Sequence, residues 1–586
     1  MDRKSITLLV FCFVLLVLWF PVMNRLYPPK PEDLARMRTN GLANAQSNIV
    51  STSSQNTALL SNSTNSLKPW NTNAPENTLV LSNEVAIYTF SSRGGGIKFI
   101  ELTKYTAAIN CARKLEDEYK FASLNTKAFV PAFTLGGSLE PGEESYQLVR
   151  TAAGVHAERP FKDGGKIIKE YSISSNYLMN VKIRIENGSK DPAVLSSPQV
   201  VIGTAAPMSV RDAEQTVGAV WYNGNKAEQI NASTFATGSF MCKNGPPLSE
   251  VVHGSSNVNW AAIHNQFFAI AVVPTEPVYQ IRSHRVPLAP FRDAGTIKDI
   301  LVVTNGYQTE LVYQSLTVNN GQPWEKSYVV YAGPREYYFL SRLGTELHNN
   351  LDAVMNYDGF SGFFAKALLL SMNALHAMGL PYALCVIGIT VIIKILFWPL
   401  VARSTRSMKR MQTLQPQLKA ITEKYKDDPM KGQQKSWEFM KEHKVSPGAG
   451  CLPMLLQIPV FFGFYRMLQS AIELRGASFL WACDLSQQDT IYYIPFLNDF
   501  PVNILPLIMG ATSLYQARLT PPSPGMDPNQ QAIMRYMPLL MLVFFYKMSA
   551  GLTLYWTVQN LVTIVQTKLT KTPEEPKKGT AVVKKK

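Results

Sequence analysis

Apolar residues gather in six stretches of the chain, and the long region between the first two stretches is polar. The stretches cover residues 6–23, 381–401, 452–471, 502–515, 533–548 and 552–569. A helix of about 20 apolar residues crosses the ~30 Å hydrocarbon core of a bilayer at ~1.5 Å rise per residue. The pattern therefore predicts a multi-pass α-helical membrane protein with six spans, one near the N-terminus and five near the C-terminus.

The first stretch has two interpretations. Arg3 and Lys4 followed by an apolar core are typical of a cleaved signal peptide as well as of a membrane anchor. The stretch ends in Trp19 and Phe20 without a small-residue cleavage pattern, and Cys12 lies too deep in it to be a lipoprotein cysteine. We therefore predict an uncleaved transmembrane anchor at 1–23.

The polar region begins with a linker and continues with the alternation of β-strands. Residues 24–78 are rich in Ser, Thr and Asn and are predicted to be flexible. Over 79–345, short alternating runs are separated by Gly, Asn and Pro. These runs lie at 85–90, 97–100, 167–173, 178–185, 267–273, 300–303 and 328–331. Many short strands over ~250 residues predict a β-sandwich.

Residues 360–378 predict an amphipathic helix that lies in the membrane interface. At helical spacing the apolar residues share one side with Ser371, and Lys366 and Asn373 fall opposite. The apolar side consists of Phe364, Ala367, Leu368, Leu375 and Met378. The five C-terminal spans then form a core at 379–570, followed by a basic tail at 571–586.

Charge orients the spans. The chain has 57 lysines and arginines against 42 acidic residues, a net charge of +15. The loop 402–450 contains eleven basic and five acidic residues, whereas the loop 472–501 contains one basic and four acidic residues. Because basic loops remain in the cytoplasm, 402–450 and both termini are predicted to be cytoplasmic. The β region then lies outside the inner membrane, which in a bacterium is the periplasm.

The basic loop is predicted to form a helical hairpin at the membrane. An apolar stripe of Met411, Leu414, Leu418, Ile421 and Tyr425 marks the first helix, and Trp437 and Met440 lie on the apolar side of the second. Attraction to anionic lipids explains the charge, and docking of a ribosome, nascent chain or targeting factor is the alternative. The candidate hairpin residues are Arg403, Arg406, Lys409, Arg410 and Met411.

A lysine lies inside the second span. Lys394 stands between Ile393 and Ile395, where a charged side chain costs about 2.5–3.5 kcal/mol on insertion scales. The five C-terminal spans contain no Asp or Glu that could pair with it. One interpretation is that its amine reaches toward the cytosol, and this is also the simpler interpretation for Arg466. The other is a hydrated cavity around Lys394.

Other polar residues in the spans favour the cavity. They are Thr390, Gln457, Thr512, Ser513, Trp556, Gln559, Asn560 and Thr563. Hydrogen bonds between helices explain single Ser or Thr residues. A central cation with several amides and no carboxylate instead indicates an electropositive, wet groove that attracts a polar, often acidic, peptide segment. Together with Lys394 these residues, Thr512 apart, form the predicted substrate groove.

The sequence lacks the motifs of several enzyme classes. It has no Walker-type glycine loop, no H-E-x-x-H and no G-x-S-x-G, and its seven histidines are scattered. We therefore predict no catalytic residues, no metal and no cofactor. Cys111 and Cys242 could form a periplasmic disulfide, a question that spacing leaves open.

Several segments resemble the YidC/Oxa/Alb family of membrane protein insertases. The main one is 444–461, which includes Gly-Cys-Leu-Pro-Met-Leu-Leu-Gln-Ile-Pro at 450–459. The segments 472–475, 549–556 and 560–563 are similar to the family as well. Residues 92–95 and the pair 333–334 resemble the periplasmic domain of its Gram-negative form.

The resemblance implies a groove that is open to cytosol and lipid and closed toward the periplasm. The family usually has an arginine in the groove, and this sequence has Lys394, which keeps the charge but loses the bidentate guanidinium. The periplasmic domain of the family resembles a sugar-mutarotase β-supersandwich, and a shared fold does not imply a shared activity. Implied partners are nascent membrane proteins, the ribosome and the Sec translocon.

The sequence thus predicts a membrane protein insertase without enzymatic activity and without a nucleic-acid substrate. A solute transporter with a periplasmic sensor domain is the alternative, but the spans show neither an internal repeat nor a carboxylate. A membrane-anchored carbohydrate-binding protein is a second alternative.

Overall fold

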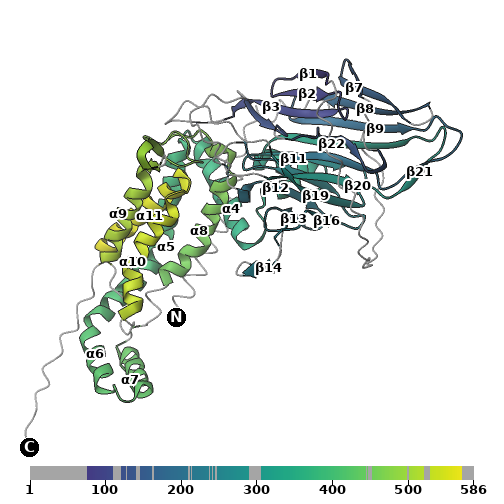
Figure 1. Ribbon diagram of the computed structural model, residues 1–586. Coiled ribbons are helices and arrows are strands. Elements are labelled where there is room, and N and C mark those ends of the chain that lie inside the picture. Colours follow the sequence, from purple (N-terminus) through teal and green to yellow (C-terminus); the bar gives the residue numbers. More distant parts are fainter. Residues whose placement is uncertain are drawn as a thin grey trace, which may run out of the picture. The chain divides into compact units, whose positions relative to one another are not determined.

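The structure is a computed structural model, and it describes residues 76–570 with gaps. The gaps are 108, 110–120, 127, 140–144, 162–163, 209–211, 213, 237, 240–241, 244–246, 289–304, 444, 446–451, 498–499 and 520–527. The predicted anchor at 1–23, nearly all of the linker, Cys111 and the tail at 571–586 lie outside the described residues. The chain divides into two compact units at Asn356 and Tyr357, which we call the β unit and the helical unit (Figure 1).

The β unit is built mainly from two antiparallel sheets. The nine-stranded sheet has the order β13 (Ala227–Ile230), β12 (Gly218–Tyr222), β17 (Trp260–His264), β18 (Phe268–Pro274), β22 (Trp324–Pro334), β9 (Leu178–Glu186), β8 (Gly165–Ile173), β7 (Gly154–Phe161) and β6 (Gln147–Arg150). The five-stranded sheet has the order β16 (Glu250–His253), β19 (Gln280–Pro287), β20 (Asn305–Val312), β11 (Gln199–Ala205) and β5 (Leu135–Gly136).

Smaller sheets and short helices complete the β unit. A four-stranded sheet runs β1 (Thr78–Ser82), β2 (Ala86–Ser91), β3 (Gly96–Thr106) and β4 (Phe121–Leu124). Two-stranded pairs join β10 (Ala193–Leu195) to β21 (Leu316–Val318) and β14 (Gly238–Ser239) to β15 (Cys242–Lys243). The helix α3 (Tyr337–Glu346) and the 3-10 turn η4 (Leu351–Met355) end the unit.

Burial along the strands follows the period of two that the sequence predicts. In β9, Met179, Val181, Ile183 and Ile185 are buried, and the residues between them are exposed or half-buried. Strands β11 and β12 are buried at every position, as expected for strands covered on both faces. The predicted β-sandwich is confirmed, although the predicted run at 300–303 lies outside the described residues.

A turn with two glycines before β3 accepts a hydrogen bond from a buried lysine. Gly94 and Gly95 have φ angles of 70° and 56°, which L side chains rarely adopt. Their carbonyl oxygens accept hydrogen bonds from Lys169 Nζ at 2.5 Å and from Tyr171 Oη at 2.7 Å. Lys169 Nζ also lies 4.6 Å from the ring centroid of Tyr146. Burial lowers the pKa of Lys169 well below its usual value.

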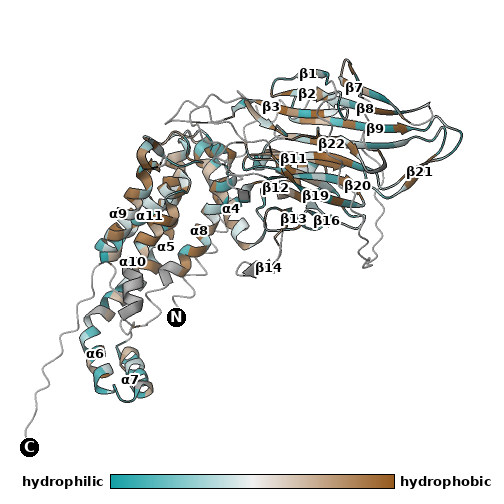
Figure 2. Cartoon of the chain, in the orientation of Figure 1, coloured by the Kyte–Doolittle hydropathy of each residue, from teal (hydrophilic) through white to brown (hydrophobic). Residues whose placement is uncertain are grey.

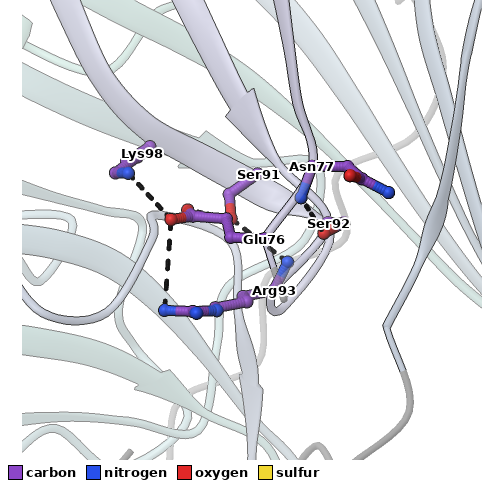
Figure 3. Close-up of polar contacts among 6 residues, drawn as sticks. All are labelled: Glu76, Asn77, Ser91, Ser92, Arg93 and Lys98. Atoms are coloured by element: carbon purple, nitrogen blue, oxygen red, sulfur yellow. Dashed lines mark hydrogen bonds and ion pairs between the residues drawn. The ribbon is translucent and has the colours of Figure 1, made fainter. Parts of the chain in front are cut away.

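The other side of this turn is held by a small ionic cluster (Figure 3). Glu76 accepts hydrogen bonds from Lys98 Nζ at 2.9 Å and from Ser91 Oγ at 2.7 Å, and Arg93 lies 4.0 Å away. The backbone N–H of Asn77 donates to Ser92 Oγ at 2.9 Å. The residues before β1 are thereby attached to the turn between β2 and β3.

The helical unit consists of eight described helices and one hairpin of strands. The helices are α4 (Gly359–Ala377), α5 (Tyr382–Thr413), α6 (Gln415–Lys424), α7 (Pro429–Glu442), α8 (Leu452–Ser470), α9 (Ile504–Leu519), α10 (Pro528–Phe545) and α11 (Ala550–Leu569). The hairpin pairs β23 (Thr490–Ile494) with β24 (Phe500–Asn503). Helices α5, α8, α9, α10 and α11 overlap the five predicted C-terminal spans.

Among the described residues, one helix, Tyr382–Met411 within α5, is long and apolar enough to cross a membrane by these properties alone. Pro459 lies inside α8 and Pro538 inside α10, and the described part of α9 has 16 residues. Figure 2 shows the contrast between the hydrophobic residues of α5 and the hydrophilic residues of α6 and α7.

Helix α4 packs against α8 through the predicted apolar side. Phe364, Ala367, Leu368 and Ser371 are buried. Met378 is exposed, because the helix ends at Ala377 and a turn through Gly379 (φ 94°) follows. On the predicted polar side, Asn373 Nδ2 donates to Glu473 Oε1 at 3.1 Å. The helix therefore contacts protein along both faces.

We expect Gly463→Ala to weaken this packing. A Cβ atom at Gly463 of α8 would lie 2.6 Å from Phe364 Cβ. Overpacking of this kind costs about 1–3 kcal/mol. The matched control is Gly388→Ala in α5, where the nearest atom would be 3.7 Å away. The midpoint of thermal unfolding in detergent should be lower for Gly463→Ala than for the wild type and unchanged for Gly388→Ala. Equal midpoints for the two variants would contradict the packing.

The burial of His264 predicts that the β unit loses stability in acid. Its Nδ1 lies 3.2 Å from Asn265 O and its Nε2 lies 3.3 Å from Gln229 Oε1. Burial, with a smaller contribution from Arg335, lowers the pKa of His264 from 6.5 to about 3. Because the unfolded chain binds this proton more readily, the free energy of unfolding falls as pH drops from 6.5 toward 3.

We therefore expect His264→Gln to reduce the acid sensitivity of the β unit. The unfolding temperature of the wild type should fall more between pH 7 and pH 4 than that of the variant, as measured by circular dichroism in the β-sheet region. His156→Gln, at a half-exposed site on β7, is the control. Parallel pH profiles for His264→Gln and wild type would contradict this expectation.

Candidate functional site

Lys394 projects from α5 toward α11. The residue is 9% exposed, and its Nζ donates to Thr563 Oγ1 at 2.9 Å. The Thr563 hydroxyl donates in turn to Gln559 O at 2.7 Å, so its oxygen is free to accept from the lysine. Within the described part of the chain, Lys394 takes part in no ion pair. A neutral oxygen is thus the partner of this cation.

Thr390 lies one turn before Lys394 and is buried. Its hydroxyl donates to Val386 O at 2.7 Å in the same helix. This bond satisfies the hydroxyl within α5, as is common for threonine in membrane helices. Thr390 therefore shares a helix face with Lys394, and its hydroxyl is directed to Val386 O.

Gln457 connects α8 to α11 through two side-chain hydrogen bonds. Its Nε2 donates to Tyr555 Oη, and its Oε1 accepts from Gln559 Nε2. Gln559 is also the residue whose carbonyl binds Thr563. A continuous series of contacts therefore joins Lys394, Thr563, Gln559, Gln457 and Tyr555 across α5, α11 and α8. We call this series the polar chain.

Asn560 belongs to a different cluster. Its Nδ2 donates to Ser513 Oγ at 2.7 Å and to Thr512 Oγ1 at 3.2 Å, both on α9. Neighbouring residues of an α-helix point about 100° apart, which separates Asn560 from Gln559. Among the predicted groove residues, Asn560 and Ser513 therefore bind α11 to α9 and stand apart from the polar chain.

Trp556 lies among aromatic rings. Its ring is 5.2 Å from Phe461 on α8 and 5.0 Å from Phe545 on α10. Tyr555, which the sequence analysis did not select, stacks on Phe464 at 4.1 Å and carries the end of the polar chain. Its position four residues before Gln559 places it on the same helix face, and this spacing was the signal that could have revealed it.

The basic hairpin is continuous with the span that carries Lys394. Helix α5 runs to Thr413, and α6 begins at Gln415 with Pro416 in its first turn. Met411, Leu414 and Val445 form a buried cluster with Phe439 and Met440 packed against it. The predicted apolar stripe therefore begins as expected at Met411 and Leu414. The single helix that was predicted to carry it is divided at Leu414 into the end of α5 and the helix α6.

The second helix of the hairpin contributes Phe439 and Met440 to this cluster. Trp437 of α7, which the sequence places on the same apolar side as Met440, is 59% exposed.

The basic residues at the start of the hairpin differ in their contacts. Lys409 Nζ donates to Thr567 O at 3.2 Å and to Thr570 O at 2.6 Å, at the C-terminal end of α11. Arg403, Arg406 and Arg410 are exposed. Lys409 thus satisfies terminal carbonyl groups, and the three arginines face solvent.

Comparisons with known proteins cover both units. Residues 78–370 match the family model described as YidC periplasmic domain, which is half of the chain, and residues 374–577 match the model described as 60Kd inner membrane protein. A membrane protein insertase YidC from Citrifermentans bemidjiense is 32% identical over 82% of this chain and 83% of its own length. The chain belongs to the YidC family.

Other YidC relatives match nearly the full length. The membrane protein insertase YidC of Syntrophus aciditrophicus is 29% identical over 97% of this chain and 98% of its own length. A solved structure of an active YidC insertase covers 83% of this chain and 91% of its own, with 18% identity and a TM-score of 0.33. As a YidC protein, the chain functions as an inner-membrane protein insertase with a periplasmic domain.

We expect Lys409→Gln to destabilise this YidC protein. The change removes a positive charge from the C-terminal end of α11, where such a charge contributes about 0.3–1 kcal/mol. Thermal unfolding in detergent should show a lower midpoint for Lys409→Gln. The control Arg406→Gln removes an exposed charge nearby and should leave the midpoint unchanged. An unchanged midpoint for both variants would show that the bonds from Lys409 do not stabilise the helices.

Proposed function

We propose that the polar chain lines the groove through which the insertase receives its clients, and that Lys394 supplies the groove's charge. The incoming nascent membrane protein places its short polar flank beside Lys394. Its hydrophobic segment moves into lipid. The flank then crosses a shorter apolar distance than it would through intact bilayer, and no nucleotide hydrolysis is required for this step.

The observation that carries the proposal is the neutral partner of Lys394. An ammonium group bonded to a hydroxyl keeps its net charge, whereas one bonded to a carboxylate loses most of its field. Two unit charges ~10 Å apart interact by about 1.7 kcal/mol at an effective dielectric constant of ~20. This attraction acts on any acidic flank without requiring one fixed geometry, which suits a compact ammonium group better than a guanidinium fork.

The amides of the polar chain suit varied clients. Gln457 and Gln559 present both donors and acceptors, so each can exchange its present bond for one with a peptide. Neither titrates. The groove therefore offers hydrogen bonds to a polar flank without a preference for one side-chain type.

The exposed faces of two helices support an exit path into lipid. On α8, Leu455, Ile458 and Phe462 are exposed at helical spacing. On α10, the exposed apolar residues are Leu539, Leu540, Val543 and Phe544. Both helices border the aromatic cluster of Trp556. A hydrophobic segment leaving the groove contacts apolar side chains on its way to the acyl chains.

The proposal includes the membrane topology expected from the charges. Six spans place both termini and the hairpin in the cytoplasm and residues 79–345 in the periplasm. Arg403, Arg406 and Arg410 face solvent at the cytoplasmic side, where they are available to anionic lipids or to a ribosome. Cooperation with the Sec translocon is part of the same proposal, as is the interfacial position of α4.

We expect Lys394→Glu to impair insertion of clients with acidic flanks most strongly. Reversal of the charge turns an attraction of about 1.7 kcal/mol into a repulsion, which predicts at least about tenfold slower insertion. Lys394→Arg should retain most activity. The measurement is insertion into liposomes that contain the purified variant, with paired clients that differ only in flank charge.

The control for the loss of a positive charge is Lys419→Glu, on the exposed surface of α6. It should leave the ratio between acidic and neutral clients unchanged. A photocrosslinker at position 394 should in addition react with ribosome-bound nascent chains. Equal insertion of acidic-flank clients by Lys394→Glu and wild type, or no crosslink from 394, would refute the role of this charge.

A further inference from the structure

The hairpin of β23 and β24 leads directly into α9. Tyr492 pairs with Val502, Tyr493 with Pro501 and Ile494 with Phe500, and the 3-10 turn η7 (Pro495–Leu497) begins the connection between the strands. Helix α9 starts at Ile504, immediately after β24. The position of the hairpin is therefore fixed at the N-terminal end of α9.

Hydrogen bonds attach both strands to the ends of the neighbouring helices. Asp489 Oδ2 accepts from the backbone N–H of Leu505 at 2.6 Å, in the first turn of α9. Asn503 Nδ2 donates to Tyr546 O at 2.8 Å, just after α10. Tyr546 Oη donates to Pro501 O at 2.7 Å, and its ring stacks on Phe500 at 5.3 Å. The hairpin is thus a firmly attached extension of α9 and α10.

The surface of the hairpin is apolar. Phe496 is 85% exposed, Tyr492 57% and Leu497 55%. Ile491 and Phe500 are exposed as well. The described residues 490–497 and 500–503 include no charged side chain. Contiguous apolar surface of this kind marks contact with a partner or a membrane, because its exposure to water is unfavourable.

The same apolar surface continues onto the helices that carry the hairpin. Leu507 and Ile508 near the start of α9 are exposed, as are Val543 and Phe544 near the end of α10. In an inner-membrane protein these helix faces contact acyl chains. The hairpin lies at the ends of the same two helices, where the hydrocarbon region gives way to headgroups. Tyrosines with an apolar ring and a polar hydroxyl are typical of this boundary.

We propose that the β23–β24 hairpin lies in the outer leaflet, at the boundary between headgroups and acyl chains, and holds α9 and α10 at a fixed depth. This inference rests on the proposed topology, in which the loop 472–501 is on the periplasmic side. Phe496 and Leu497 insert between lipids. The hydrogen bonds at the ends of the two strands then fix the depth of α9 and α10. The partner is lipid, and a client chain or another protein is the competing possibility.

The test uses the full-length protein in nanodiscs of phosphatidylethanolamine and phosphatidylglycerol. A photoreactive p-benzoylphenylalanine replaces Phe496 in one preparation and Val194, an exposed residue of β10, in the other. After irradiation, mass spectrometry should detect lipid adducts at 496 and about tenfold fewer at 194. Equal yields at the two positions would overturn the proposal. Adducts at 496 that form with added ribosome-bound client in place of lipid would overturn it as well.

A second variant separates insertion of the hairpin from mere proximity to lipid. With the photoreactive residue at 492, the double substitution Phe496→Asp and Leu497→Asp should lower the lipid adduct about tenfold, because two carboxylates enter the interface unfavourably. Thermal unfolding verifies that the variant is folded. An unchanged adduct yield would refute insertion. Client insertion by the Lys394 variants is measured separately, so failure of the hairpin proposal leaves the groove proposal intact.

Discussion

The helical unit has to accommodate Lys394, a cation in the middle of α5, among predicted spans that contain no carboxylate. Lys394 meets a hydroxyl oxygen, and the β unit solves a similar problem with Lys169 in another way. Lys169 donates to two carbonyl oxygens and lies against the ring of Tyr146, so its surroundings are closed and its role is to hold the glycine turn. Lys394 has one described hydroxyl partner, which leaves two of its three donors for water or substrate. The difference in partners separates a structural lysine from a candidate functional one.

The polar chain explains why the surroundings of Lys394 lie where they do. Thr563 is oriented by the carbonyl of Gln559, and the side chain of Gln559 is held by Gln457. Three helices therefore cooperate in placing one hydroxyl oxygen. Because buried polar groups are costly without partners, each member of the polar chain restricts the position of the next. In the proposed function, a polar client takes the place of the Thr563 hydroxyl at Lys394.

Much of this arrangement could be predicted from the sequence, and the exceptions have physical causes. The alternation of apolar and polar residues was enough to predict the β-sandwich. The polar residues at helical spacing in 552–569 were enough to select Gln559 and Thr563 as candidate groove residues. Helix geometry separates Asn560 from Gln559, but its partners Ser513 and Thr512 could not be predicted, because they depend on which neighbour each helix face meets. Tyr555 was missed because a tyrosine in an apolar run is ambiguous until its hydroxyl partner is known. The exposure of Trp437 reflects local packing of a short helix, which periodicity alone does not fix.

The short helices and the hairpin together bear on the thickness of the bilayer at the groove. At ~1.5 Å per residue, the described residues of α9, Ile504–Leu519, span about 24 Å, less than the ~30 Å hydrocarbon core. A helix that is too short thins the surrounding bilayer or requires additional apolar surface at its end. The hairpin supplies such surface at the N-terminal end of α9, through Phe496 and Leu497. In the proposed mechanism, a thinner membrane beside α9 and α10 would shorten the path of a polar flank, as the proposed groove also does.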